Sequence, residues 1–161
     1  MKIQNSFLFL FACISLVSCD KNRVFDEYKS VDNAWHKDSI VSFKLPQLET
    51  AKKYNLFVNV RDNNDFPFNN LFLIVSLEQP NKQTLVDTLE YQMANPDGTL
   101  MGDGFSDIKE NKLVFKQNAS FNQKGIYKIN IQQAVRETGK IVGEKELKGI
   151  TEVGFRIESI E

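Results

Sequence analysis

The stretch at residues 54–77, YNLFVNVRDNNDFPFNNLFLIVSL, decides the fold of this chain. Every second residue from Tyr54 to Val60 is apolar, which is the two-residue period of a half-buried β-strand. Turn-forming residues follow at Asp62–Asp65, with Pro67 behind them. A nearly continuous apolar run at residues 71–77 then has the composition of a strand covered on both faces. The stretch therefore predicts two neighbouring strands with a polar turn between them.

The same two-residue period recurs on both sides of this stretch. Further strands are expected at residues 41–45, 83–91, 113–115, 127–131 and 153–157. No helix longer than one or two turns is indicated. Strands separated by turns, without helices, predict an all-β fold, namely an antiparallel β-sandwich of immunoglobulin-like or jelly-roll-like type. Tyr127 opens a late strand and resembles the tyrosine corner of such sandwiches, with an ordinary core tyrosine as the alternative.

The N-terminus has the order of features found in a bacterial lipoprotein signal peptide. The basic pair Met1-Lys2 precedes the apolar run Phe7–Val17, which is shorter than the ~20 residues a spanning helix needs. The run ends in Leu16-Val17-Ser18-Cys19, which resembles a lipobox. The resemblance implies a diacylglycerol on the Cys19 sulfur, cleavage before Cys19 and acylation of the new amine. The alternative is an ordinary signal peptide with a chance cysteine.

These features divide the chain into three parts. Residues 1–18 are expected to be the cleaved signal peptide, 19–34 the lipidated cysteine and a tether, and 35–161 the β-sandwich domain. A short first strand at Val24-Phe25 is the alternative within the tether. Surface-exported lipoproteins of the Bacteroidota resemble one another in an acidic run soon after the cysteine, whereas Asp20–Arg23 here has one acidic and two basic residues and no such run. We therefore expect an outer-membrane anchor with the domain facing the periplasm. The inner membrane and the cell surface are the alternatives.

Composition excludes several classes of function. Lys and Arg number 20 against 21 Asp and Glu, so the chain lacks the positive charge that binding to nucleic acid requires. One His and two Cys leave little for metal binding or covalent catalysis, and no nucleophile, zinc, phosphate or dinucleotide motif is present. We expect no enzyme, no cofactor and no small-molecule substrate. The expected partners are the membrane, through the acyl chains, and other proteins.

The segment 92–112 is long for a connection in a compact β-domain. Its carboxylates Asp97, Asp103 and Asp107 form a weak candidate Ca²⁺ site, although their spacing does not match an EF-hand loop. Turn chemistry is the alternative, because Asp-Gly pairs accept the backbone angles of tight turns. Leu100, Met101 and Phe105 stand among the glycines, so the loop either folds back on the sandwich or offers an apolar surface to a partner. Such a partner surface is expected to use Trp35, Leu100, Met101 and Phe105.

Ser39 is a candidate O-glycan acceptor. It stands in Asp38-Ser39-Ile40, which resembles the short acceptor motif of exported Bacteroidota proteins. A different class of function, a glycan-binding sandwich, would use Trp35 and loop aromatic residues as stacking platforms.

Several motifs in combination resemble one known family. They are the lipobox, Trp35-His36-Lys37-Asp38, Leu100-Met101-Gly102-Asp103-Gly104 with Asp107-Ile108, Gly125-Ile126-Tyr127 and the terminal segment Leu147–Glu158. Together they resemble the GldH family of gliding-motility lipoproteins of the Bacteroidota, over nearly the whole chain. The resemblance implies a non-catalytic, all-β lipoprotein that is a component or assembly factor of the gliding apparatus, with a link to type IX secretion. Cys19 is the one position to which it assigns a defined chemical role.

Overall fold

The structure is a computed structural model that describes residues 21–160, so the signal peptide, the lipobox and Cys19 lie outside the described residues. The strands of this part are β1 (Arg23–Ser30), β2 (Ala34–His36), β3 (Val41–Lys44), β4 (Lys53–Asp62), β5 (Asn70–Glu78), β6 (Thr84–Gln92), β7 (Lys109–Ala119), β8 (Lys128–Gln133), β9 (Glu146–Lys148) and β10 (Ile150–Ile160). None of these residues forms a helix long and apolar enough to cross a membrane.

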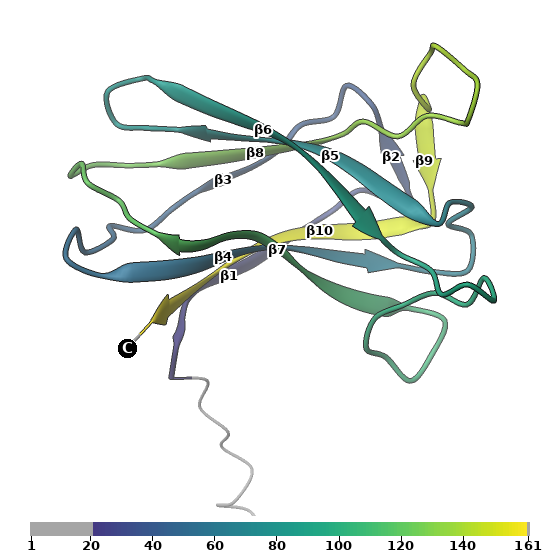
Figure 1. Ribbon diagram of the computed structural model, residues 1–161, viewed down its shortest axis with the longest axis horizontal. Helices are drawn as coiled ribbons and strands as arrows, with labels where there is room; N and C mark the ends of the chain where they lie inside the picture. Colours follow the sequence, from purple (N-terminus) through teal and green to yellow (C-terminus); the bar gives the residue numbers. More distant parts are fainter. Residues whose placement is uncertain (1–20, 161) are drawn as a thin grey trace, which may run out of the picture.

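Two four-stranded antiparallel sheets face each other as the layers of a sandwich (Figure 1). The lower sheet has the strand order β1-β10-β4-β7, and the upper sheet has the order β3-β8-β5-β6. The short pair β2-β9 lies at one end of the sandwich. The expected antiparallel β-sandwich is confirmed, and all five expected strands beyond the 54–77 stretch are present.

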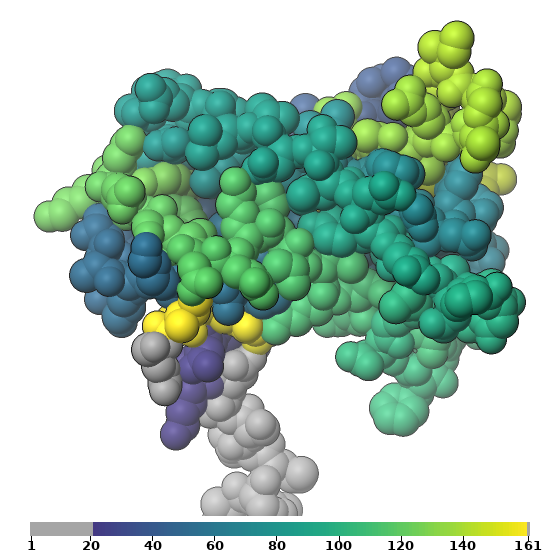
Figure 2. Space-filling model, viewed as in Figure 1, coloured from purple at the N-terminus to yellow at the C-terminus, as the bar shows by residue number. Residues whose placement is uncertain are grey.

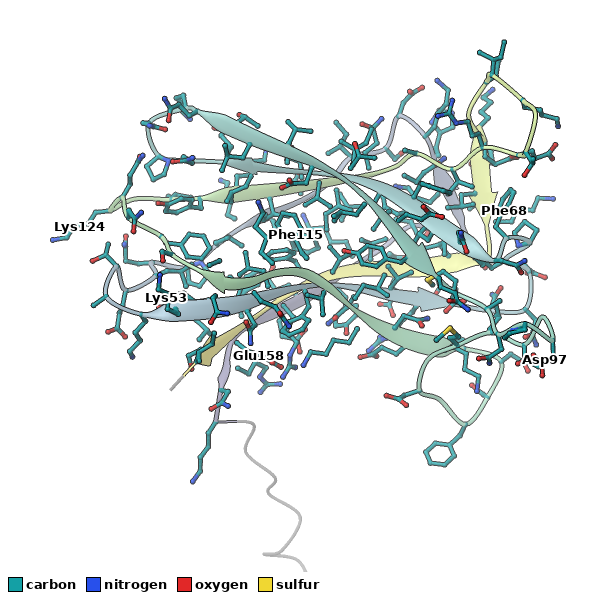
Figure 3. The ribbon with its side chains drawn as sticks, viewed as in Figure 1. Lys53, Phe68, Asp97, Phe115, Lys124 and Glu158 are labelled. Atoms are coloured by element: carbon teal, nitrogen blue, oxygen red, sulfur yellow. The ribbon has the colours of Figure 1, made fainter. Side chains whose placement is uncertain are left out.

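The core between the sheets follows from the two-residue period. Leu56, Val58 and Val60 of β4 are fully buried from the lower sheet, and alternate residues of β5 are buried from the upper sheet. Phe115 of β7 lies between the two layers (Figure 3) and contacts the ring of Phe155 edge to face. Burial on both faces was expected for residues 71–77, but the outward side chains of β5 are only half-buried. The 134–144 loop lies against Phe72 and Ile74 and covers this face only in part.

Tyr127 closes the connection between the two sheets as a tyrosine corner does. It lies directly before β8, is buried, and its hydroxyl accepts a hydrogen bond from the backbone N–H of Gln123 at 3.0 Å. Gln123 belongs to the segment that carries the chain from β7 in the lower sheet to β8 in the upper sheet. The bond to the backbone of an inter-sheet connection is the feature that the tyrosine-corner interpretation requires.

The expected tether at residues 19–34 is wrong for most of its length. Arg23–Ser30 form the edge strand β1, which pairs with β10 from Arg23↔Glu158 to Ser30↔Glu152. The backbone N–H of Ser159 donates to the carbonyl of Asn22 at 2.8 Å, so ordered pairing already begins there. The composition of β1 is polar because an edge strand with a solvent-facing side needs few apolar residues. Phe25 supplies the core contact, at 6.3 Å from the ring of Phe43.

Candidate functional site

The outer face of the lower sheet carries an ionic lattice centred on Arg61 of β4. Its Nε donates to Glu110 at 2.9 Å and its Nη1 to Glu152 at 2.6 Å. Its guanidinium group stacks over the ring of Tyr28 at 4.3 Å, and the Tyr28 hydroxyl donates to Glu110 at 2.9 Å. Burial, followed by the hydrogen bond to Glu110, raises the pKa of Tyr28 to about 12. Tyr28 therefore stays protonated and keeps donating at any physiological pH.

A second group of charges extends the lattice toward the end of β10. Arg156 donates to Asp26 at 2.8 Å and to Glu158 at 2.7 Å, and Lys112 donates to Glu158 at 2.6 Å. Glu158 lies on the underside of the lower sheet in Figure 3. Desolvation opposes these ion pairs, yet the two hydrogen-bonded cations lower the pKa of Glu158 on balance. Every cation named here has a carboxylate partner, so this face presents matched charges rather than a patch of one sign.

A buried carboxyl group lies at the C-terminal end of β4, where β4 pairs with the first residues of β7. Asp62 is fully buried and accepts a hydrogen bond from Asn111 of β7 at 2.9 Å through Oδ1, while Oδ2 has no hydrogen-bond partner. Burial raises the pKa of Asp62 from 3.8 to about 6. The sequence placed Asp62 in the polar turn, whereas it is the last residue of β4, at an inward position of the alternating strand, and this parity was a usable signal.

The raised pKa predicts that Asp62 makes the domain less stable as the pH rises. Between about pH 4 and 6 the unfolded state releases the proton while the folded state keeps it, so stability falls with pH and the loss is complete above 6. At 1.36 kcal/mol per pKa unit, the loss is up to about 3 kcal/mol. Asp62→Asn should therefore gain stability relative to wild type as the pH rises from 4 to 7, measured by urea denaturation.

Asp97→Asn is the matched control for this prediction. Hydrogen bonds from Thr99 lower the pKa of the exposed Asp97, so its removal leaves the Asp62 contribution in place. A stability difference between Asp62→Asn and wild type that is constant from pH 4 to 7 would contradict the assignment.

The 92–112 segment forms two turns rather than a metal site. Asp97 accepts hydrogen bonds from the backbone N–H and the hydroxyl of Thr99, at 3.0 and 2.6 Å. Asp103 pairs with Glu110 through two backbone hydrogen bonds. Among residues 21–160 no three carboxylate, His or Cys side chains are grouped to hold a metal ion, so Asp97, Asp103 and Asp107 are not brought together. The turn chemistry that was the alternative interpretation accounts for these residues.

The predicted partner surface divides into buried and exposed residues. Trp35 has 0% exposed area and its Nε1 donates to the Ser39 carbonyl at 2.8 Å, so the expectation that it lies on a surface is wrong. Leu100 packs, half-buried, against the core. Met101 is 37% exposed and Phe105 is fully exposed. Figure 2 shows the segment that leads into β7 protruding below the body of the domain. The accessible part of the predicted surface is therefore Met101 and Phe105.

Ser39 lies in an exposed turn between β2 and β3. Its backbone N–H donates to the His36 carbonyl at 2.9 Å, and its own carbonyl holds the Trp35 indole. The position is accessible to a modifying enzyme, and its glycosylation stays a prediction.

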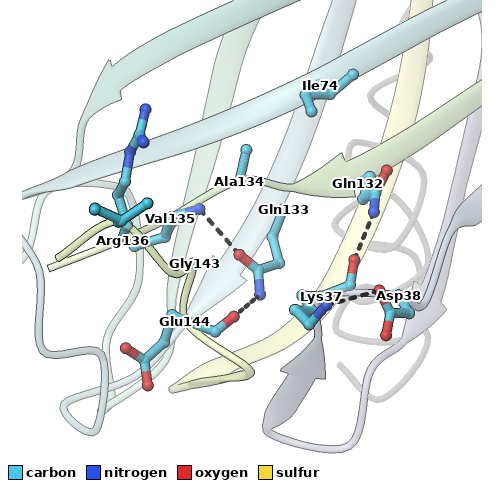
Figure 4. Close-up of a pocket in the computed structure, with 11 residues that line it drawn as sticks. Lys37, Asp38, Ile74, Gln132, Gln133, Ala134, Val135, Arg136, Gly143 and Glu144 are labelled. Carbon is cyan, nitrogen blue, oxygen red and sulfur yellow. Dashed lines mark hydrogen bonds and ion pairs between the residues drawn. The ribbon is translucent and has the colours of Figure 1, made fainter.

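A shallow pocket of about 300 Å³ lies where the end of β8 meets the 134–144 loop (Figure 4). The Gln133 amide donates to the Glu144 carbonyl at 2.7 Å and accepts from the Val135 N–H at 3.0 Å. The Gln132 amide donates to the Lys37 carbonyl at 2.7 Å. Both amides hydrogen-bond to backbone groups of neighbouring segments and hold these segments together. The residues around the pocket therefore have a structural role. Gln133 was missed from the sequence, although it stands in line with the buried Ile129 and Ile131.

Comparison with known proteins gives a consistent set of relatives. Residues 23–157 match the family model described as GldH lipoprotein. The gliding motility lipoprotein GldH of Flavobacterium johnsoniae is 68% identical over 158 residues, which cover 98% of each chain. A GldH homolog of Christiangramia forsetii is 51% identical over 152 residues, covering 94% of this chain and 93% of its own. Among solved structures, a VP2 subviral particle of infectious bursal disease virus has a TM-score of 0.39 at 10% identity, covering 85% of this chain and 33% of the viral chain.

Proposed function

This chain belongs to the GldH family of gliding-motility lipoproteins, and from this premise we propose that it is a non-catalytic component or assembly factor of the gliding apparatus. The observation that carries the proposal is the family match over residues 23–157, which is nearly all of the folded domain. A link to type IX secretion belongs to the same proposal. In this role the domain acts by binding other proteins, and Met101 and Phe105 are the exposed candidates for such contacts.

The burial of Trp35 argues against the alternative of a glycan-binding sandwich. A stacking platform needs an accessible aromatic face, and the Trp35 ring is enclosed by the core. Phe105 is an exposed aromatic residue, but it is one ring on a narrow turn, and no other ring of residues 21–160 packs against it. These observations favour the protein-binding role.

The proposed anchor is an acylated Cys19 in the outer membrane, with the domain in the periplasm. It is supported by the lipobox Leu16–Cys19 at the end of a short apolar run and by the lack of an acidic run in Asp20–Arg23. Two or three acyl chains anchor a protein stably without a transmembrane helix.

Cys19→Ala should abolish acylation, membrane retention and gliding together, because the thiol is the group that accepts the lipid. Metabolic labelling with a palmitate analogue, membrane fractionation and colony spreading measure the three effects. Cys13→Ala is the matched control. It removes the other cysteine of the chain, which lies within the apolar run, and should leave acylation, membrane retention and gliding unchanged. Equal label in wild type and Cys19→Ala would contradict the anchor.

The orientation is read from the same cells with proteinase K. A periplasmic domain should resist the protease until the outer membrane is permeabilised. Digestion in intact cells would place the domain on the cell surface and contradict the periplasmic orientation.

A further inference from the structure

The most exposed aromatic residue of the described chain stands at the end of a tightly closed turn. We define the β6–β7 tip as residues 103–110. Backbone hydrogen bonds of 2.9 and 2.8 Å between Asp103 and Glu110 close its base, and Lys109 Nζ donates to the Gly104 carbonyl at 2.9 Å. A Cβ on Gly104 would lie 2.3 Å from the Ile108 carbonyl oxygen, so the turn is narrower than another residue allows. The tip therefore holds Phe105 in a fixed, outward position.

The tip exposes two large apolar side chains beside an excess of carboxylates. Phe105 is fully exposed and Ile108 is 45% exposed. Residues 103–110 hold three carboxylates and one Lys, and one of these carboxylates, Glu110, is paired with Arg61 of the ionic lattice. Moving a Phe side chain from water into an apolar phase is favourable, so a tip of this kind gains free energy when it reaches such a phase.

The start of the fold fixes how far the domain can lie from its anchor. Pairing begins at Asn22, whose carbonyl accepts from Ser159 N–H. Only Asp20 and Lys21 separate Asn22 from Cys19, so the Cα atoms of Cys19 and Asn22 can be at most about 11 Å apart. An acylated Cys19 lies at the membrane interface. The beginning of β1 must therefore rest close to the bilayer surface.

The tip and the beginning of β1 extend from the same side of the domain. In Figure 1 the first residues of β1 point downward from the lower sheet, and the loop that enters β7 also descends below that sheet. The 134–144 loop, by contrast, rises from the opposite side. A membrane that holds the start of β1 thus faces the tip as well.

We propose that the β6–β7 tip inserts Phe105, flanked by Ile108, into the interface of the bilayer that holds the acylated Cys19. This inference rests on the proposed acylation. The tip is then a second point of membrane contact, and together with the anchor it fixes which way the lower sheet faces. The outer face of that sheet, with its matched charges, lies toward the lipid headgroups, while the upper sheet and the 134–144 loop face away.

The test uses the full-length acylated protein with Phe105→Cys, labelled with the polarity-sensitive dye NBD and reconstituted into phosphatidylcholine vesicles. Acylation blocks the Cys19 sulfur, and Cys13 leaves with the signal peptide, so the introduced thiol is the one that reacts. Ile141→Cys is the matched control, because Ile141 is 92% exposed in the 134–144 loop on the opposite side. Spin-labelled phosphatidylcholine serves as the quencher.

At position 105 the emission should shift to the blue in vesicles and lose most of its intensity to the spin-labelled lipid. At position 141 neither change should occur. If the protein floats with the vesicles but both positions behave as in water, the tip inference is overturned while the anchor stands. If the wild-type protein does not float with vesicles, the acylation fails and the tip inference fails with it.

Discussion

Trp35→Ala is expected to destabilise the domain by about 3–5 kcal/mol, the range for replacing a fully buried large aromatic residue by alanine. The Trp35 ring has 0% exposed area and belongs to the core cluster, while β2, which carries it, is held by a three-residue pairing with β9. The substitution also removes the indole N–H that donates to the Ser39 carbonyl. Urea denaturation of residues 21–161, monitored by far-UV circular dichroism, measures the loss in the free energy of unfolding.

Two further variants separate burial from aromatic character. Trp35→Phe keeps much of the apolar volume but loses the hydrogen bond to Ser39, so it should fall between wild type and Trp35→Ala. Phe105→Ala removes a comparable ring from a fully exposed position and should change stability by no more than about 0.5 kcal/mol. Equal effects of Trp35→Ala and Phe105→Ala would contradict the placement of these two rings.

Gly149→Ala is expected to cost about 2–5 kcal/mol. Gly149 joins β9 to β10 with a φ of +82°, and a Cβ there would lie 2.1 Å from the backbone nitrogen of Phe66 and 2.5 Å from its Cα. The left-handed backbone contributes about 1–2 kcal/mol for a residue with a side chain, and overpacking contributes about 1–3 kcal/mol. The Phe66 backbone cannot easily move away, because Phe66 N–H donates to the Asn63 carbonyl at 3.0 Å and Asn63 N–H donates to the Gly149 carbonyl at 2.9 Å. The same urea denaturation measures the cost.

Gly139→Ala isolates the backbone contribution. Gly139 has a φ of +83°, and nothing lies within 4 Å of a Cβ built there. This variant should lose only about 1–2 kcal/mol. If the two alanine variants lost the same amount, the close approach to Phe66 would not be the cause of the larger effect.

The central strands could be predicted from the sequence because their periodicity is a direct consequence of burial on one face. β4, β8 and β10 each alternate over several residues, so a period of two is visible without knowledge of their neighbours. β1 escaped full recognition because its partners are distant. Asp26 pairs with Arg156, 130 residues further along the chain, and no local sequence pattern predicts that pairing.

The exposure of single side chains was the weakest part of the sequence analysis. Trp35 sits on a three-residue strand, too short to show a period, and its burial depends on the pairing of β2 with β9 more than a hundred residues away. The carboxylates of the 92–112 segment were recognised as turn-forming or metal-binding, and local hydrogen bonds decided between the two. For Phe105 the sequence left open whether the loop folds back on the sandwich or exposes its apolar residues, and the structure leaves this ring fully exposed.

The position of β1 determines how tension on the lipid anchor would be transmitted. In the strand order of the lower sheet β1 has β10 as its one neighbour, so a pull on Cys19 loads the β1–β10 ladder before any other part of the described domain. β10 is an inner strand that pairs along its length with β4, and β4 pairs in turn with β7. With the proposed acyl anchor on Cys19, the ladder between the first and last strands is the mechanical link between the membrane and the rest of the protein.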